Sequence, residues 1–303
     1  MTIVGERTDD EILEDSSGDL EESEPKRQRR PIDWLVVGAV LTTLGLSLVL
    51  FLVYVFAFTN FQEARAQRQL LNAFTTSQGV VPLSGKLPAD GLPTAVLTIP
   101  ALNLSKVAVQ GTSSKETAQG PGVMSQAARP GTIGNAVIIG RRSTSGAPFA
   151  KLNTLRSGDK IKIASGLGVF HYVVVHSGVV TPGQKDPASP VNRPLLTLMT
   201  AENPGGNSSK YYVVARLVGG PGAAPKPTTK PTASALGSTG DASAVVPSII
   251  LGILYLLCIA GTIVAYKRNR ANFWTVYIIS TPIVLALALF WFEHLYLLLP
   301  ATF

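Results

Sequence analysis

Cysteine is almost absent from this sequence. Its 303 residues contain one cysteine, Cys258, which lies within a long apolar run. No disulfide can form within the chain, and no segment outside that run offers a thiolate as a nucleophile. We predict neither a metal site nor a cofactor.

Charge is nearly absent from three long stretches. Two of them, Trp34 to Phe58 and Val245 to Tyr266, hold no charged residue over 25 and 22 positions. The third, Phe273 to Leu299, contains only Glu293 and His294. At about 1.5 Å of rise per residue, each stretch crosses a hydrocarbon layer of roughly 30 Å. We therefore predict three transmembrane helices.

Positive charge at the flanks predicts the orientation. Basic clusters precede the first run, at residues 26–30, and separate the second from the third, at residues 267–270. Such clusters stay in the cytoplasm. We expect a multi-pass cell-membrane protein with a cytoplasmic N-terminus, while residues 59–244 and the C-terminus are extracytoplasmic. The first run reads as an uncleaved anchor, because it is long and follows a 33-residue hydrophilic lead.

Acidic residues are scarce in the extracytoplasmic part. Residues 59–244 carry 18 Lys or Arg against 7 Asp or Glu, a net charge of +11. Such a basic surface binds anionic lipid headgroups or wall polymers, or serves only solubility. Residues 1–25 are the opposite, with ten acidic groups and one arginine, and read as a disordered tail. Nucleic acid is not an expected partner of an extracytoplasmic domain.

Short strands dominate the region between the first two apolar runs. Alternating or apolar segments separated by Gly/Pro turns recur from residue 95 to residue 218, and residues 160–163 and 170–175 read as a hairpin. About eight strands with one brief helix near residues 114–120 predict a closed β-barrel. The fold class is therefore mainly β, with three added transmembrane helices.

The segments follow in a simple order. We predict an acidic tail with a basic juxtamembrane cluster (1–33), a transmembrane helix (34–58), a helical extension and linker (59–94), the barrel (95–218), a Pro/Gly/Ala/Thr linker (219–244), a second transmembrane helix (245–266), a cytoplasmic basic loop (267–272) and a third transmembrane helix (273–299).

The most informative stretch runs from Gly134 to Leu152 and reads GNAVIIGRRSTSGAPFAKL. An apolar strand there ends in two arginines beside a polar turn, which is a common way to place side chains at a site. The stretch resembles the sortase family, whose catalytic histidine lies in the motif G-N-x-x-I-x-G-H-R, followed by G-A-P-F-x-x-L. The resemblance spans residues 95–218 and is nearest to the class E-like, housekeeping type of high-GC Gram-positive bacteria.

The resemblance implies a cysteine transpeptidase. In that family a thiolate attacks a sorting-signal peptide, a histidine protonates the leaving amine and an arginine stabilises the oxyanion. At the positions of the cysteine, the histidine and the arginine, this sequence has Ala201, Arg141 and Lys210, respectively. Alanine has no heteroatom, and the guanidinium of arginine stays protonated. Loss of nucleophile and base together costs about 10⁶-fold in rate. We therefore predict that the protein is not an enzyme, but a degenerate member of the family.

Two groups of residues are candidate binding sites. Arg141, Arg142 and Lys210 form a candidate groove for an anionic group, the alternative being drift after loss of catalysis. Glu293 and His294 are a candidate intramembrane contact with a partner subunit. The alternative for that pair is the interfacial belt.

These residues and the predicted fold lead to three alternative functions. The first is a catalytically inactive scaffold or accessory subunit of a cell-envelope or membrane complex, with membrane-protein partners. The second is an extracytoplasmic module that binds a peptide or an anionic wall polymer in the former groove. The third is a hydrolase or transpeptidase with a non-cysteine nucleophile, drawn from the hydroxyls near the site and served by Lys210.

Overall fold

The computed structural model describes residues 34–76, 88–180, 186–203, 209–220, 240–268 and 273–302. The predicted acidic tail, most of the two linkers and residues 269–272 of the basic loop lie outside the described residues.

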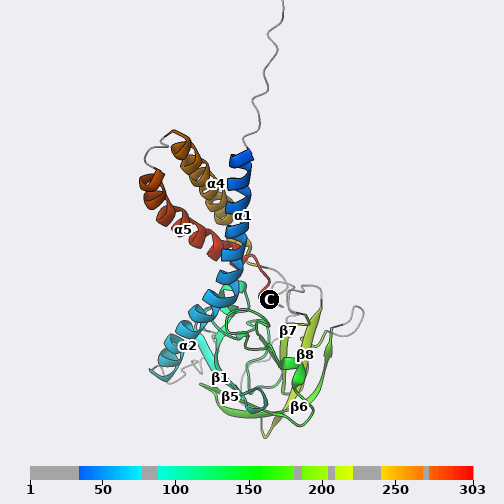
Figure 1. Cartoon of the computed structure of the whole chain (residues 1–303). Coiled ribbons are helices and arrows are strands. Elements are labelled where there is room, and N and C mark those ends of the chain that lie inside the picture. Colours follow the sequence, from blue (N-terminus) through cyan, green and yellow to red (C-terminus); the bar gives the residue numbers. More distant parts are fainter. Residues whose placement is uncertain are drawn as a thin grey trace, which may run out of the picture.

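A closed barrel of eight strands forms the lower part of the molecule in Figure 1. Its strand order is β1-β2-β3-β4-β7-β8-β6-β5. The strands are β1 (Pro93–Ile99), β2 (Leu104–Gln110), β3 (Gly122–Val123), β4 (Asn135–Ile139), β5 (Lys160–Ser165), β6 (Gly168–Val179), β7 (Leu195–Ala201) and β8 (Lys210–Val218). Two neighbouring pairs are parallel, β2–β3 and β4–β7, and the others are antiparallel. The predicted fold class is confirmed, including the β5–β6 hairpin.

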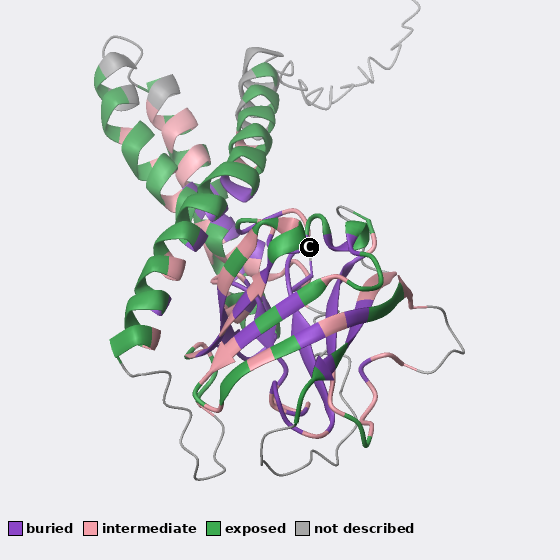
Figure 2. Cartoon of the chain, turned by 90° about the horizontal axis from the view of Figure 1, so that it is seen from below, coloured by how far each residue is buried: buried purple, intermediate pink, exposed green. Residues whose placement is uncertain are grey.

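Alternation along the strands separates two apolar layers. Leu196 and Leu198 of β7 point into the barrel core, whereas Met199 packs on its outer side with Val137 and Ile139 of β4. The interior of the barrel is accordingly the buried region in Figure 2. Each fully buried side chain of this size contributes about 1.5–3 kcal/mol to folding. The strand period of two thus explains both the core and the covered outer face.

Short helical segments connect the strands. They are η2 (Pro100–Leu102), α3 (Ser114–Thr117) and η3 (Leu152–Thr154). The helix α3 is one turn long and begins with a capping box between Ser113 and Glu116.

Three helices are long and apolar enough to cross a membrane. A continuous helix comprises α1 (Trp34–Val53), the π-helical turn η1 (Tyr54–Phe58) and α2 (Thr59–Thr76). After the one-turn η4 (Ala242–Ala244), the hairpin of α4 (Val245–Arg268) and α5 (Phe273–Leu297) rises beside α1 (Figure 1). A cluster around Tyr54, Tyr255 and Phe292 joins the three helices near the barrel.

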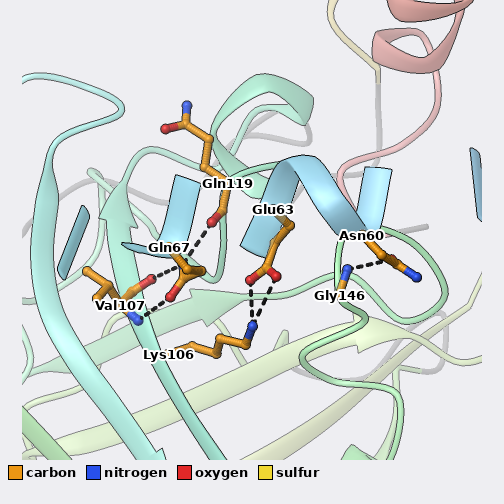
Figure 3. A network of polar contacts seen from close by, with 7 residues as sticks. All are labelled: Asn60, Glu63, Gln67, Lys106, Val107, Gln119 and Gly146. Carbon is orange, nitrogen blue, oxygen red and sulfur yellow. Dashed lines mark hydrogen bonds and ion pairs between the residues drawn. The ribbon is translucent and has the colours of Figure 1, made fainter. Parts of the chain in front are cut away.

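Helix α2 is bound to the barrel by polar side chains (Figure 3). Lys106 Nζ forms an ion pair with Glu63 at 2.8 Å. Gln67 accepts a hydrogen bond from the Val107 amide at 2.8 Å and donates to the Val107 and Gln119 carbonyls at 2.9 and 2.7 Å. The pairing of β2 with β3 covers only Val109 and Gln110, so the Gln67 amide satisfies backbone groups of β2 beyond that ladder.

Candidate functional site at the ends of strands β4 and β7

The parallel pairing of β4 and β7 brings two chain positions together that are 60 residues apart. Ile139 pairs with Met199, and the Gly140 amide donates to the Met199 carbonyl at 3.0 Å. A side chain at Gly140 would lie 2.4 Å from the Phe149 ring, so only glycine fits there. Arg141 and Ala201 therefore leave the barrel at the same end. We call Arg141, Arg142, Ala201 and Lys210 the β4–β7 site.

Arg141 is the largest fully buried side chain of the described chain. Its Nη2 donates to the Ser114 carbonyl at 2.8 Å and its Nη1 to the Thr144 hydroxyl at 3.2 Å. Its guanidinium carbon lies 4.6 Å from the centre of the Tyr296 ring, on α5. Burial lowers the pKa of Arg141, and Tyr296 opposes that shift. The guanidinium therefore connects the barrel to the membrane hairpin.

The neighbouring Arg142 points elsewhere. Its Nη1 donates to the Ala201 carbonyl at 3.3 Å, and its backbone amide donates to the Thr302 carbonyl at 3.2 Å. Ala201 is 1 % exposed. The structure thus places Arg142 beside Ala201, and directs Arg141 into the protein interior.

Lys210 is the cross-strand partner of Ala201 in the β7–β8 ladder. Directly opposed residues project from the same face of a sheet, so the side chains of Lys210 and Ala201 lie on the same face of the barrel wall. Burial lowers the pKa of Lys210 to about 8, and the nearby Asp186 acts against that shift. A lysine of this pKa is partly neutral just above neutral pH, which allows it to accept a proton.

The turn after Arg142 has an unusual backbone. Ser145, Gly146 and Ala147 all have positive φ, at 50, 71 and 42°. A side chain at Gly146 would lie 2.5 Å from the Glu63 carboxylate. The Gly146 amide donates to Asn60 of α2 at 2.7 Å (Figure 3). Helix α2 therefore holds a turn that most L-residues adopt only under strain.

The hydroxyls near the site are engaged in contacts. Thr200 donates to the Gly140 carbonyl at 2.9 Å. Ser145 and Tyr296 share a hydrogen bond, and the Tyr296 hydroxyl lies 3.4 Å from Thr144 Oγ1. Within the described residues, no cluster of three His, Cys, Asp or Glu side chains forms that could hold a metal ion.

Residues 298–302, which follow α5, lie on the barrel at this site. We call them the C-terminal segment, and its end is marked close to β7 in Figure 1. Ser114 Oγ donates to the Leu299 carbonyl, and Ala301 and Thr302 are 0 % and 2 % exposed. The segment is thus part of the packed structure of the barrel end.

Glu293 and His294 lie at a cavity between α5, α3 and η4. Glu293 is exposed, and His294 is half-buried with its Nδ1 2.9 Å from the Phe290 carbonyl. The cavity has a volume of about 370 Å³, and Lys115 and Asp241 also line it. Glu293 and His294, the predicted contact with a partner subunit, therefore face a cavity that this chain itself forms beside the barrel.

Part of this chain matches a known protein family. The family model of the sortase domain matches residues 97–218. Sortase E from Streptomyces avermitilis is 30% identical, over 44% of this chain and 91% of that protein, with a TM-score of 0.39. The chain belongs to the sortase family. No curated protein matches it.

Other solved sortases are more distant from this sortase-family chain. A Clostridium perfringens sortase D5 transpeptidase is 23% identical over 51% of this chain and 99% of its own length, with a TM-score of 0.46. Sortase E1 from Streptomyces coelicolor, solved with a tripeptide in its active site, is 25% identical over 43% and 90%, with a TM-score of 0.36.

The match corrects one prediction. The sequence-based prediction that this protein is not an enzyme is contradicted, because sortases are cysteine transpeptidases and nothing in the described residues shows that this one lacks activity. The prediction gave most weight to the three family positions and kept an enzyme with a non-cysteine nucleophile only as the third of the functions compared. Since the only cysteine is Cys258 in α4, chemistry at the β4–β7 site has to use another nucleophile.

Sequence reasoning missed Ser114, Tyr296 and Thr302 as parts of this site. Tyr296 lies within the predicted third transmembrane helix, and Thr302 follows it. Their contacts with Arg141 and Arg142 join residues about 30 to 160 positions apart. The only signal in the sequence was that Arg141 has no acidic residue near it in the chain. The burial of an arginine is not visible in a sequence, so this signal did not identify the contacts.

Proposed function

We propose that this sortase-family protein is a scaffold or accessory subunit of a cell-envelope or membrane complex. The observation that carries the proposal is the contact of the barrel with two separate helices, α2, which continues the membrane helix α1, and α5. Helix α2 holds it through Glu63 and Gln67, and α5 holds it through Tyr296. Anchoring alone requires one membrane helix, whereas a barrel held twice has a fixed position relative to a partner in the membrane.

The membrane helices leave apolar surface for a partner. Large side chains of α1, α4 and α5 are exposed in the described chain, among them Leu41, Leu256 and Ile278. Lipid covers such faces, and so do the helices of another membrane protein, which pack on them by close van der Waals contact. The basic flanks support an orientation with the barrel outside the cytoplasm, where anionic lipid or wall polymer is also within reach.

We also propose the class E-like assignment. The identity of 30% with sortase E from Streptomyces avermitilis supports it. Under this proposal the protein is an envelope component of a Gram-positive cell.

Co-purification tests the scaffold proposal. A tagged full-length chain is isolated from gently solubilised native membranes, after brief cross-linking, and bound proteins are quantified by mass spectrometry. We expect a membrane protein in near-stoichiometric amount that is absent from an untagged control. Recovery of the chain alone, in two detergents and after cross-linking, would contradict the proposal.

Lys210 favours a second candidate function, acyl transfer by a hydroxyl nucleophile. Its pKa of about 8 suits a general base, and it lies beside the position of the family's cysteine. A hydroxyl oxygen would attack the substrate carbonyl while its proton passes to the Lys210 amine. The C–N bond then breaks, and that proton goes to the leaving amine, which yields an acyl ester on the chain.

Covalent labelling tests this second candidate. A fluorophosphonate probe should modify a serine or threonine of the full-length chain, and the adduct should disappear in Lys210→Ala. The matched control is Lys162→Ala, which removes an exposed lysine of β5 and should leave labelling unchanged. Absence of labelling, or labelling that persists in Lys210→Ala, excludes Lys210 as the base.

A further inference from the structure

The eight strands of the barrel carry charge of one sign only. None of them contains Asp or Glu, whereas Lys or Arg occurs on β2, β5 and β8. Three of these basic residues, Lys160 and Lys162 of β5 and Arg216 of β8, are exposed. They form no ion pair within the described part of the chain. The outer face of β5, β6 and β8 is therefore basic, and no acidic side chain of the strands balances it.

The strand register brings these residues into one patch. Val173 of β6 pairs with Lys160 on one side and with Arg216 on the other. Lys162 pairs with His171 in the next row of the same face. Neighbouring strands are about 4.8 Å apart and alternate residues of one strand about 6.6 Å, so the Cα atoms of the three cations lie within roughly 12 Å of one another. Physiological salt screens a charge over about 8 Å, so their fields overlap.

The patch is not neutralised by the carboxylate nearest to it in sequence. Asp159 accepts a hydrogen bond from the Arg156 amide at 2.8 Å, in the turn before β5. Like charges at neighbouring positions of one sheet face repel each other and destabilise the sheet. A bound anion relieves that repulsion. A ligand therefore explains the patch better than a contribution to folding does.

Polar residues continue the patch across the barrel. Thr98 of β1 pairs with Lys162 on one side and with Ser105 of β2 on the other. Ser105 and Arg68 both line a groove of about 180 Å³ between α2 and the strands β1 and β2, and Arg68 is exposed. We define the basic track as Arg216, Lys160, Lys162, Thr98, Ser105 and Arg68.

The position and length of the basic track restrict its ligand. In Figure 1, β5 and β6 lie at the end of the barrel opposite to α1, α4 and α5, so the track faces away from the bilayer that these helices cross. It runs from β8 over β6, β5 and β1 to β2, which is four strand spacings or roughly 19 Å. A ligand that contacts the whole track is therefore long and linear, and is not a single ion.

We infer that the basic track binds a linear polyanion of the extracytoplasmic space, whose repeating units carry phosphate or carboxylate groups beside hydroxyls. Arg216 and Arg68 form bidentate contacts with such anionic groups, and the lysines attract them as point charges. Thr98 and Ser105 supply hydroxyls for the polar parts of the repeating units. The inference rests on the proposed extracytoplasmic position of the barrel and not on the scaffold function, and it concerns a face other than the β4–β7 site.

Two double variants of the full-length chain, in nanodiscs of uncharged lipid, test the inference. Lys160→Gln with Lys162→Gln removes two charges from the basic track. The matched control, Lys115→Gln with Lys151→Gln, removes two exposed lysines elsewhere. The probes are fluorescent poly(glycerol phosphate) and polygalacturonate, which present phosphate and carboxylate groups, and neutral dextran. Fluorescence anisotropy measures their binding at several salt concentrations.

At least one of the two polyanions should bind the wild type and the control variant with equal affinity. The track variant should bind it at least about tenfold more weakly. The plot of log Kd against log salt concentration should also become less steep by roughly 1, because two charged contacts are lost. The polyanion that binds more tightly identifies the charged group of the ligand.

Three outcomes would overturn the inference. The first is that neither polyanion binds the wild type at low salt, or that dextran binds equally well. The second is an equal loss in both double variants, which would mean that net charge alone matters. The third is displacement of the polymer by anionic lipid vesicles at equal charge concentration, which would assign the face to a membrane surface. Thermal unfolding verifies that both variants fold. None of these outcomes affects the co-purification test, so the scaffold proposal stands or fails separately.

Discussion

Two adjacent arginines at the end of β4 have different tasks. Arg141 is 0 % exposed and contacts α3, the following turn and α5, whereas Arg142 reaches the end of β7 and the C-terminal segment. A buried guanidinium without a carboxylate partner in the described chain carries a desolvation cost. The Ser114 carbonyl, the Thr144 hydroxyl and the Tyr296 ring offset that cost together.

Substitution of the two arginines should separate these tasks. Arg141→Ala leaves a cavity and removes the hydrogen bonds of the guanidinium to Ser114 and Thr144, and should destabilise the protein by about 2–4 kcal/mol. Arg142→Ala should cost under about 1 kcal/mol, since its half-buried side chain makes one hydrogen bond within the described part of the chain. Thermal unfolding of both variants in detergent measures the difference. Equal midpoints would show that Arg141 contributes no more than Arg142.

Lys210 should produce a distinctive dependence of stability on pH. Its folded pKa of about 8 lies below the ordinary value of 10.5. Between these values the unfolded chain binds more protons, so the free energy of unfolding rises with pH from about 8 to 10. Tyr172, whose pKa burial raises to about 12, affects stability only above pH 10, where it acts in the opposite direction.

The variant Lys210→Met isolates this effect. Thermal midpoints of the wild type should rise from pH 8 to pH 10 relative to those of Lys210→Met, and the difference should be constant below pH 8. Parallel pH profiles of the two proteins would mean that the pKa of Lys210 is not lowered by folding.

At the scale of elements, α2 is a brace, in the sense that it binds both the barrel strand β2 and the turn at the β4–β7 site and continues the membrane helix α1. Its side chains Glu63 and Gln67 hold β2, and its Asn60 holds the turn at Gly146 (Figure 3). The turn contains three consecutive residues with positive φ, which the surrounding contacts have to maintain. A change in α2 should therefore affect both the barrel edge and the site.

Gln67→Leu tests the brace. The substitution leaves the Val107 amide and carbonyl without their side-chain partner and should destabilise the barrel by about 2–3 kcal/mol. Gln69→Leu is the control, because Gln69 is exposed on the same helix. Hydrogen exchange of the Val107 amide should accelerate in the first variant alone. Unaltered protection at Val107 would contradict the proposed role of Gln67.

At the scale of the whole molecule, a membrane hairpin and a membrane-anchored barrel are packed into one unit. The cluster around Tyr54, Tyr255 and Phe292 joins α1, α4 and α5, and Tyr296 joins α5 to the barrel (Figure 1). Displacement of the hairpin would uncover Arg141 and the C-terminal segment together. The membrane helices and the β4–β7 site are therefore mechanically connected.

Cysteine labelling tests the orientation of this unit. Cys258→Ser removes the only thiol, and single cysteines are then introduced at Ser157, which is exposed on the barrel, or at Ala271 in the basic loop. A membrane-impermeant maleimide should label the Ser157→Cys variant in intact cells. The Ala271→Cys variant should react only after permeabilisation. The reverse pattern would place the barrel in the cytoplasm.

The sequence by itself determined the architecture of this protein. Period-two alternation and Gly/Pro turns specify short strands, and charge-free runs specify membrane helices, because both signals are local and repeat along the chain. The motif around Arg141 also indicated the sortase family, which the comparison with known proteins shows. The sequence also shows which residues occupy the three catalytic positions of the family. The conclusion drawn from them, that the protein is not an enzyme, was wrong.

Only the tertiary structure decided what surrounds those residues. The burial of Arg141 and the C-terminal segment beside Arg142 both depend on barrel closure and on the return of α5 to the barrel. Such contacts join residues far apart in the chain, and no local propensity encodes them. The physical reason is that desolvation and hydrogen bonding act on whatever folding brings together in space.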